Sequence, residues 1–186
     1  MYDKGKNIVL IGFMGSGKTT VGVKLSYRLR RPVIDTDKLI ESRQQKKISE
    51  IFAEEGEDAF RRMETALLQE LAGQAYERIF SVGGGTPVRE ENRPLLKKCG
   101  IVFYLRAQAE TIYGRLQGDT TRPLLQCENP LGRIRELLQA REAAYADCAD
   151  VILDVDGATV EELVDRIEAI LRETYGIEWK AEGATE

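Results

Sequence analysis

The 186-residue chain contains no histidine, and this absence narrows the chemistry open to it. Histidine is the usual side chain for proton transfer near neutral pH, so carboxylates, lysine or water would have to move any protons. Triads and metal clusters that depend on histidine are excluded as well.

Cysteine is scarce, and no C-x-x-C spacing occurs among the three cysteines, Cys99, Cys127 and Cys148. An odd number without that spacing argues against a disulfide framework and against a zinc site. We interpret all three as ordinary small side chains. A reactive thiol is the alternative, but the acidic neighbours of Cys148 oppose thiolate formation.

Long apolar runs are missing too. No stretch approaches the roughly 18 apolar residues of a membrane span, and residues 1–6 lack the apolar core of a signal peptide. We therefore expect a cytoplasmic protein that makes no membrane contact.

Length and charge suggest a single domain that binds small anions. With 42% hydrophobic and 31% charged residues, the chain can bury one core but is too short for two comfortable domains. Residues 154–186 carry ten acidic and three basic side chains, which leaves a surplus of three positive charges on the first 153 residues. That surplus is too small to indicate nucleic-acid binding. We expect a monomer with no nucleic-acid partner.

Alternating strand and helix patterns predict an α/β fold with a five-stranded parallel sheet flanked by helices. Short β-branched and aromatic runs predict strands at residues 8–11, 32–34, 79–82, 101–105 and 151–153. Helical periodicity predicts helices at residues 21–30, 38–46, 49–55, 58–76, 90–97, 108–117, 132–145 and 160–175.

The last predicted helix has clear ends. Thr159 and Glu162 form a capping box before its apolar stripe, and Gly176 fits its C-terminal stop. Residues 1–176 would form the domain. The tail, residues 177–186, shows no periodicity, and we expect it to be poorly ordered.

The most specific motif is Gly12-Phe13-Met14-Gly15-Ser16-Gly17-Lys18-Thr19, which joins the first predicted strand to a helix. In this context a glycine-rich loop presents backbone N–H groups to phosphate, Lys18 reaches the β- and γ-phosphates, and Thr19 supplies a hydroxyl to Mg²⁺. The alternative is a glycine-rich turn that happens to carry a lysine. Four specified residues at fixed spacing make that alternative the weaker one.

Two carboxylates, Asp35 and Asp37, follow the second predicted strand, at the edge where parallel sheets bind ligands. One could hold a water of Mg²⁺ while the other meets a substrate hydroxyl. Alternatively, either aspartate could cap the next helix.

Further along the chain, Arg61 and Glu64 lie three residues apart on a predicted helix. They form either a surface ion pair or a cleft guanidinium that recognises an acidic substrate. Three successive glycines, residues 83–85, follow the third strand. They indicate the close approach of a ligand or of another backbone, although a flexible turn is the alternative.

A long irregular loop at residues 118–130 carries Arg122, which is suited to meeting phosphate, so we predict a lid rather than a passive connection. Arg115 could stack on a nucleobase or simply lie in solvent. Arg141 and Tyr145, one helical turn apart, could bind a ligand or pack as amphipathic side chains.

Taken in order over residues 8–171, these motifs resemble the shikimate kinases. The quoted segments are the phosphate loop, Asp-Thr-Asp, Phe-Arg-Arg-Met-Glu, Gly-Gly-Gly, Thr-Arg-Pro-Leu-Leu and Arg-x-x-x-Tyr. The resemblance implies a three-layer P-loop fold like that of nucleoside monophosphate kinases, with a mobile lid and a substrate-binding region at residues 36–62. It implies phosphorylation of the shikimate 3-hydroxyl by ATP with one Mg²⁺ ion, in the route to chorismate and the aromatic amino acids.

The resemblance also implies roles for individual residues. The residues it assigns to ATP are Gly15, Ser16, Gly17, Lys18, Thr19, Thr20, Arg115 and Arg122. Those it assigns to shikimate are Asp37, Arg61, Gly83, Gly84, Gly85 and Arg141, supported by Phe52, Phe60 and Glu64. Thr19 would bind Mg²⁺ directly and Asp35 through water, while Lys18, Asp37 and Arg122 would be catalytic. No roles are assigned at residues 155–158, where the adenine-side loop is expected.

Two other functions remain open at this point. A gluconate kinase of the same architecture would also use an arginine and an aspartate, but Arg61, Arg141 and residues 83–85 together favour shikimate. A nucleotide-hydrolysing switch protein is the alternative from another class. The guanine-specifying sequence Asn-Lys-x-Asp is absent.

Overall fold

The structure is a computed structural model that describes residues 7–74, 76–117 and 127–177. Its centre is one parallel sheet with the strand order β2-β3-β1-β4-β5. The strands are β1 (Ile8–Ile11), β2 (Val33–Asp35), β3 (Ile79–Ser81), β4 (Ile101–Arg106) and β5 (Val151–Asp154). This confirms the predicted five-stranded parallel sheet.

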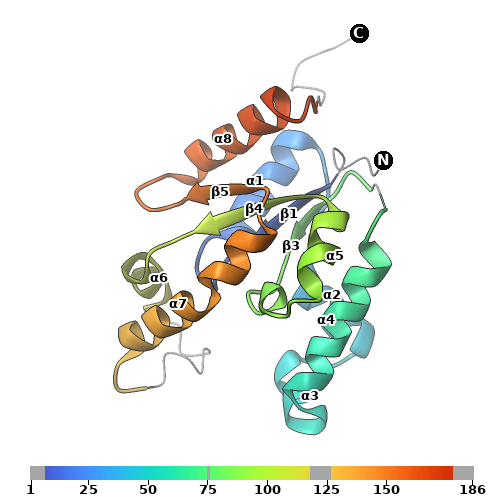
Figure 1. Cartoon of the computed structure of the whole chain (residues 1–186), viewed down its shortest axis with the longest axis vertical. Coiled ribbons are helices and arrows are strands. Elements are labelled where there is room, and N and C mark those ends of the chain that lie inside the picture. Colours follow the sequence, from blue (N-terminus) through green and yellow to red (C-terminus); the bar gives the residue numbers. More distant parts are fainter. Residues whose placement is uncertain (1–6, 75, 118–126, 178–186) are drawn as a thin grey trace.

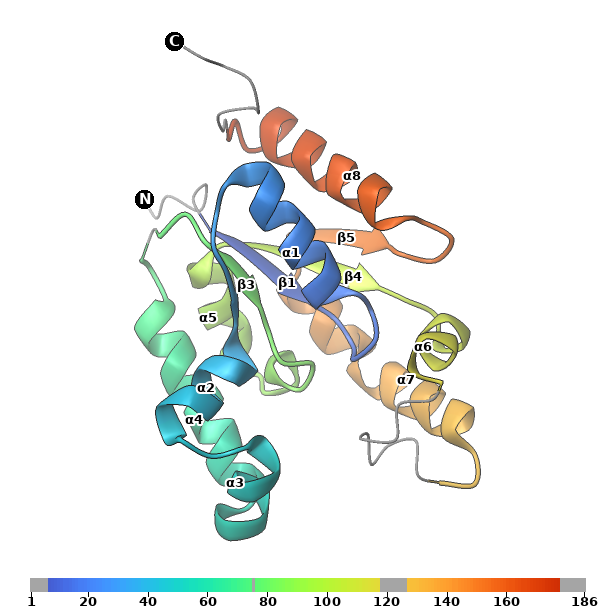
Figure 2. The ribbon, with the colours of Figure 1, turned by 180° about the vertical axis from the view of Figure 1, so that it is seen from behind.

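Helices cover both faces of the sheet and make three layers. They are α1 (Lys18–Leu29), α2 (Thr36–Gln44), α3 (Ile48–Glu55), α4 (Glu57–Leu71), α5 (Asn92–Cys99), α6 (Ala109–Leu116), α7 (Pro130–Cys148) and α8 (Val160–Glu173), with a short 3₁₀ helix, η1 (Thr86–Val88). Figure 1 shows α5 and α7 in front of the strands, and Figure 2 shows α1 and α8 in front of the opposite face.

Apolar stripes explain why these helices pack where they do. On α8, Leu163, Val164, Ile167 and Leu171 are all buried, as their spacing predicts. The predicted capping box is also confirmed, because the Thr159 hydroxyl accepts the Glu162 N–H at 3.2 Å.

Several predicted boundaries need correction. The helix predicted at 58–76 ends at Leu71, since Gly73 takes a left-handed φ of 78° and donates its N–H to the Lys98 carbonyl at 3.1 Å. The helix predicted at 132–145 runs from Pro130 to Cys148, because Asn129 caps it by accepting the Gly132 N–H. Helix η1 was not predicted.

At the C-terminal end, Ile177 was placed in the tail by the sequence, but it is buried and donates its N–H to the Leu171 carbonyl at 2.9 Å. Residues 178–186 lie outside the described residues. Among the helices in the described ranges, none is both long and apolar enough to cross a membrane.

Strand register gathers the predicted motifs at one edge of the sheet. Leu10 of β1 and Asp35 of β2 both align with Ser81 of β3. The phosphate loop, the two aspartates and the three glycines therefore leave neighbouring strands at the same level, where parallel sheets bind ligands.

Candidate functional site

The phosphate loop has the backbone that its glycines predict. Gly12, Gly15 and Gly17 have φ values of 147°, 76° and 102°, which side chains other than glycine rarely adopt. A Cβ on Gly12 would also lie 2.7 Å from the Leu105 carbonyl oxygen. Since no side chain caps α1 at Gly17, the N-terminus of this helix can offer its N–H groups to an anion.

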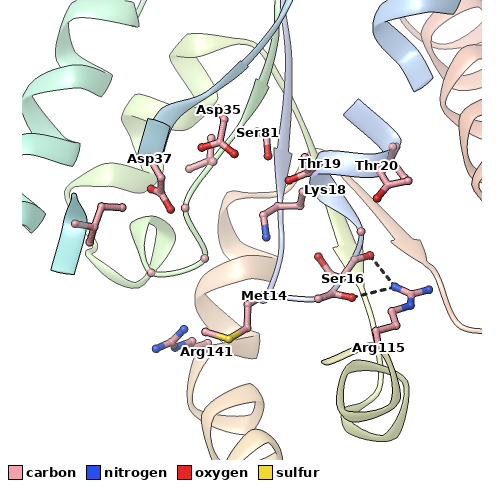
Figure 3. A pocket seen from close by; sticks show the side chains of 18 of the residues that line it. Met14, Ser16, Lys18, Thr19, Thr20, Asp35, Asp37, Ser81, Arg115 and Arg141 are labelled. Carbon is pink, nitrogen blue, oxygen red and sulfur yellow. Dashed lines mark hydrogen bonds between the residues drawn. The ribbon is translucent and has the colours of Figure 1, made fainter. Parts of the chain in front are cut away.

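Lys18, the first residue of α1, extends along this loop. Its ammonium donates to the carbonyl oxygens of Gly12 and Phe13 at 2.7 and 3.0 Å. The ammonium therefore sits over the loop, where a phosphate bound by the loop amides would meet it (Figure 3).

Arg115 comes to the same loop from α6. Its Nη1 donates to the carbonyl oxygens of Gly15 and Ser16, both at 3.1 Å (Figure 3). Arg115, for which the sequence suggested base stacking, therefore lies against the backbone of the phosphate loop and ties α6 to it.

One of the two aspartates caps the helix that follows them, as the sequence allowed, and both reach the cleft. Asp35 caps α2, because its carboxylate accepts the Lys38 N–H at 3.1 Å. Asp37 lies in the first turn of the same helix and does not cap it. Both carboxylates line one cleft with Lys18 and Thr19 (Figure 3).

Asp37 has the most perturbed carboxyl group at the site. Its Oδ1 is buried and accepts no hydrogen bond within the described part of the chain. The pKa of Asp37 is raised to about 6, chiefly by burial and then by the negative charges of Glu64 and Asp35, while Lys18 and Arg61 lower it by less. A carboxylate that lines the cleft and has a pKa near neutral pH is suited to accept a proton from a ligand hydroxyl.

The three glycines pack tightly against the other parts of the site. A Cβ on Gly83 would lie 2.5 Å from Asp37 Oδ1, and one on Gly84 would lie 3.3 Å from the Gly12 carbonyl oxygen. A Cβ on Gly85 would lie 2.7 Å from Cζ of Arg61. Close approach, rather than turn flexibility, is therefore the reason for this sequence.

Arg61 and Glu64 form a half-buried ion pair at the wall of the cleft. Arg61 Nη1 donates to Glu64 Oε2 at 2.7 Å, and the Glu64 side chain is 2% exposed. The guanidinium lies 5.6 Å from the centre of the Phe60 ring, which meets Phe52 edge to face. Two aromatic rings and a fixed guanidinium suit a flat, acidic ligand.

Arg141 reaches the cleft from α7. Its guanidinium lies 5.4 Å from the centre of the Phe13 ring, in the phosphate loop. One turn later, the buried Tyr145 hydroxyl donates to the Gly84 carbonyl at 2.7 Å. Burial raises the pKa of Tyr145 to about 12, so this hydroxyl keeps its proton and anchors the glycine turn to α7.

These groups line one cleft of about 770 Å³. It includes the predicted site residues from all parts of the described chain: Gly15, Ser16, Gly17, Lys18, Thr19, Thr20, Asp35, Asp37, Phe52, Phe60, Arg61, Glu64, Gly83, Gly84, Gly85, Arg115 and Arg141. Arg122 and residues 118–126 of the predicted lid lie outside the described residues.

The structure also brings residues to the cleft that we did not predict, among them Met14, Ile48, Ser81, Ala158, Val160 and Leu163. Val160 and Leu163 belong to the apolar stripe of the helix predicted at residues 160–175, and that periodicity indicated a packing role alone. Their apolar side chains, with Ala158, give one region of the cleft the surface that a nucleobase needs. No signal in the sequence separated these two apolar residues from the core.

The oxygen atoms of Thr19 and Asp35 could bind a magnesium ion only if a bound ligand supplied further oxygen atoms. Thr19 and Asp35 offer hard oxygen atoms toward the cleft. Within the described ranges, however, no group of three or more acidic or cysteine side chains could hold a metal. Phosphate oxygens and water would have to complete the coordination.

Comparison with known proteins gives a consistent result. The sequence model of the shikimate kinase family matches residues 14–172. The chain is 45% identical over 162 residues to a shikimate kinase of Thermodesulfovibrio yellowstonii, which covers 87% of this chain and 92% of that protein. Its fold is similar to that of the shikimate kinase from Acinetobacter baumannii solved in complex with shikimate, with a TM-score of 0.83 and 37% identity over 91% of this chain and 94% of that one.

A gluconokinase from Sinorhizobium meliloti 1021 shares the fold at a TM-score of 0.61 and 17% identity, over 92% of this chain and 94% of that chain. This likeness extends to the architecture alone. It agrees with the expected fold of the nucleoside monophosphate kinase type.

Proposed function

The chain belongs to the shikimate kinase family, and from this premise we propose that it transfers the γ-phosphoryl group of ATP to the 3-hydroxyl of shikimate. The products are shikimate 3-phosphate and ADP, in the route to chorismate and the aromatic amino acids. The observation that carries the proposal is one cleft holding both a phosphate loop and an acid-binding wall made by Asp37, Arg61 and the glycine turn.

ATP would bind on the side of the cleft formed by the phosphate loop. The loop amides and Lys18 would hold its phosphates, with Thr20 at the start of α1 and the apolar region around Val160 facing the nucleoside. The Thr19 hydroxyl and, through water, Asp35 would hold Mg²⁺, which would supply positive charge to offset that of the phosphates. Arg122 would add a positive charge from the lid, by analogy with the family.

Shikimate would bind on the side formed by α4 and the glycine turn. Arg61 and Arg141 would share its carboxylate, while Phe52 and Phe60 would pack against its ring. In the reaction, the 3-hydroxyl oxygen bonds to the γ-phosphorus, the bond from that phosphorus to the bridging β-oxygen breaks, and the hydroxyl proton passes to Asp37. Since the transition state is loose, Asp37 would contribute mainly by orienting the hydroxyl.

A coupled assay of ADP release tests this function directly. With MgATP present, we expect turnover that depends on shikimate and is not supported by gluconate. Turnover with gluconate alone would reassign the chain to the gluconate kinases. Acceleration by neither acid, but by a protein partner, would favour the nucleotide switch.

We also propose that the chain acts as a single kinase domain, as a monomer in the cytoplasm. One continuous hydrophobic core across the described residues supports the single domain. Light scattering after size-exclusion chromatography tests the oligomeric state, and cell fractionation tests the location.

The pKa of Asp37 predicts an acidic limb in the rate profile. Because burial raises this pKa to about 6, the carboxylate is ionised at pH 8 and mostly protonated at pH 5. We expect kcat/KM for shikimate at pH 5 to be about tenfold lower than at pH 8. Rates measured from pH 4.5 to 8.5 provide the test, and a flat profile down to pH 5 would contradict the assignment of Asp37.

Replacing Gly85 with alanine should selectively weaken shikimate binding. The backbone at Gly85 has an ordinary φ of −88°, so the damage would come from the new methyl group, which would press on the Arg61 guanidinium. We expect KM for shikimate to rise about tenfold or more, with KM for ATP unchanged. Gly114→Ala is the matched control, since a Cβ there meets nothing within 4 Å. Equal effects of the two variants would contradict the prediction.

A further inference from the structure

The buried carboxylate of Glu64 links two separate segments of the cleft wall. Its Oε2 accepts the hydrogen bond from Arg61, on the same helix. Its Oε1 accepts a hydrogen bond from the hydroxyl of Thr86, which begins η1 directly after the glycine turn. Both carboxylate oxygens therefore have donors, as a buried charge requires.

Thr86 is itself held firmly in place. It is 2% exposed, and its N–H donates to the Gly83 carbonyl at 3.1 Å. Its own carbonyl accepts from the amide of Asn92, a fully buried residue, at 2.9 Å. The side-chain oxygen of Asn92 accepts in turn from the Thr65 hydroxyl on α4 at 2.8 Å. The Thr86 hydroxyl is thus a fixed donor rather than a rotating surface group.

Arg61 stands between two competing carboxylates. Its Nε and Nη2 donate to Glu57 Oε1 at 3.2 and 2.7 Å, on the side of the helix that faces solvent. The Glu57 side chain is 62% exposed, whereas Glu64 is buried against the cleft. The exposed Glu57 side chain can move with Arg61 toward solvent, whereas the buried Glu64 side chain cannot. The orientation of the guanidinium toward the cleft therefore depends on how firmly Glu64 is held.

We propose that Thr86 is a positioning residue, whose hydroxyl fixes Glu64 and, through Glu64, aims the Arg61 guanidinium at the carboxylate of the acid substrate. This inference rests on the proposed function. Without the hydroxyl, Glu64 Oε1 loses a donor in a buried place, and the carboxylate turns to recover one. Arg61 then loses its fixed partner on the cleft side and moves toward Glu57. The loss falls on acid binding, because the Thr86 hydroxyl bonds no group of the phosphate loop.

Thr86→Ala and Thr86→Ser form the decisive pair, since they differ by one hydroxyl and both lack the threonine methyl group. We expect Thr86→Ala to raise KM for shikimate about tenfold relative to Thr86→Ser, with kcat and KM for ATP within about twofold. Thr86→Val keeps the shape of threonine without the hydroxyl, so it should behave like Thr86→Ala. Thermal melts of all three show whether the fold is retained.

The kinetics of the Thr86 variants and of the wild-type chain distinguish failure of this inference from failure of the proposed function. If the wild-type chain turns over shikimate but Thr86→Ala and Thr86→Ser share the same KM, the inference is wrong and the proposed function stands. A parallel rise in KM for ATP, or an equal loss of kcat, would show general loosening and would also overturn it. If Thr86→Ala does not fold, Thr86→Val decides by the same criteria. If the wild-type chain shows no shikimate-dependent turnover, the proposed function itself fails.

Discussion

Asp37→Asn is expected to lower kcat about a thousandfold while leaving the affinity for ATP nearly intact. Asparagine fills the same space, but its neutral amide orients the hydroxyl less strongly than a carboxylate does, and it cannot take the hydroxyl proton. Asp37 lies across the cleft from the phosphate loop residues, so nucleotide binding should not depend on it. Steady-state rates with shikimate, together with calorimetry of ADP binding, provide the measurement.

The thermal stability of Asp37→Asn shows whether a lower kcat comes from the missing carboxylate or from a damaged fold. Because the pKa of Asp37 is raised to about 6, its ionised form at pH 8 destabilises the fold by up to about 3 kcal/mol relative to a neutral group. This penalty fades as the pH falls below 6. A neutral asparagine avoids it, so the melting temperature at pH 8 should not fall.

Asp58→Asn serves as the control, since Asp58 lies on the exposed surface of α4 and does not line the cleft. Its kinetics should match those of the wild-type chain. An Asp37→Asn variant that loses ATP affinity as strongly as it loses turnover would refute the separate role of this carboxylate.

Lys18→Ala is expected to damage nucleotide handling itself, with a loss of about 10²–10³ in kcat and a clear rise in KM for ATP. Lys18 would supply a positive charge to the phosphates held by the loop. Its ammonium also bonds the carbonyls of Gly12 and Phe13, so the loop loses part of its support when the side chain is removed. Rates measured at varied ATP and at saturating shikimate give both constants.

Lys24→Ala is the matched control on the same helix. Lys24 is partly exposed, pairs with Glu161 at 2.9 Å and does not line the cleft. Its removal should leave both constants within about twofold, as for most surface substitutions. If Lys18→Ala kept its affinity for ATP and lost only shikimate binding, the nucleotide would have to lie elsewhere.

The sheet could be predicted from the sequence because its strands read as short apolar runs, and the central strands β1, β3 and β4 are buried on both faces. The phosphate loop could also be predicted, because its backbone takes positive φ values that require glycine at fixed positions. The convergence of Asp37 and residues 83–85 followed from the rule that parallel strands end at one edge of the sheet, whereas Arg61, on α4, was placed with them only by the family resemblance.

Other features depended on contacts between distant segments, which periodicity does not encode. Tyr145 bonds the Gly84 carbonyl across 61 residues of sequence, and Arg115 bonds the Gly15 carbonyl across 100. Helix η1 is only three residues long and is held by Glu64 and Asn92. The early end of α4 likewise follows from the bond between Gly73 and Lys98.

A crystal structure of the chain with MgADP and shikimate tests the central claim most directly. We predict the shikimate carboxylate within about 3 Å of both the Arg61 and Arg141 guanidiniums, and the 3-hydroxyl at Asp37, facing the phosphate loop. A shikimate carboxylate bound away from these two arginines would contradict the account.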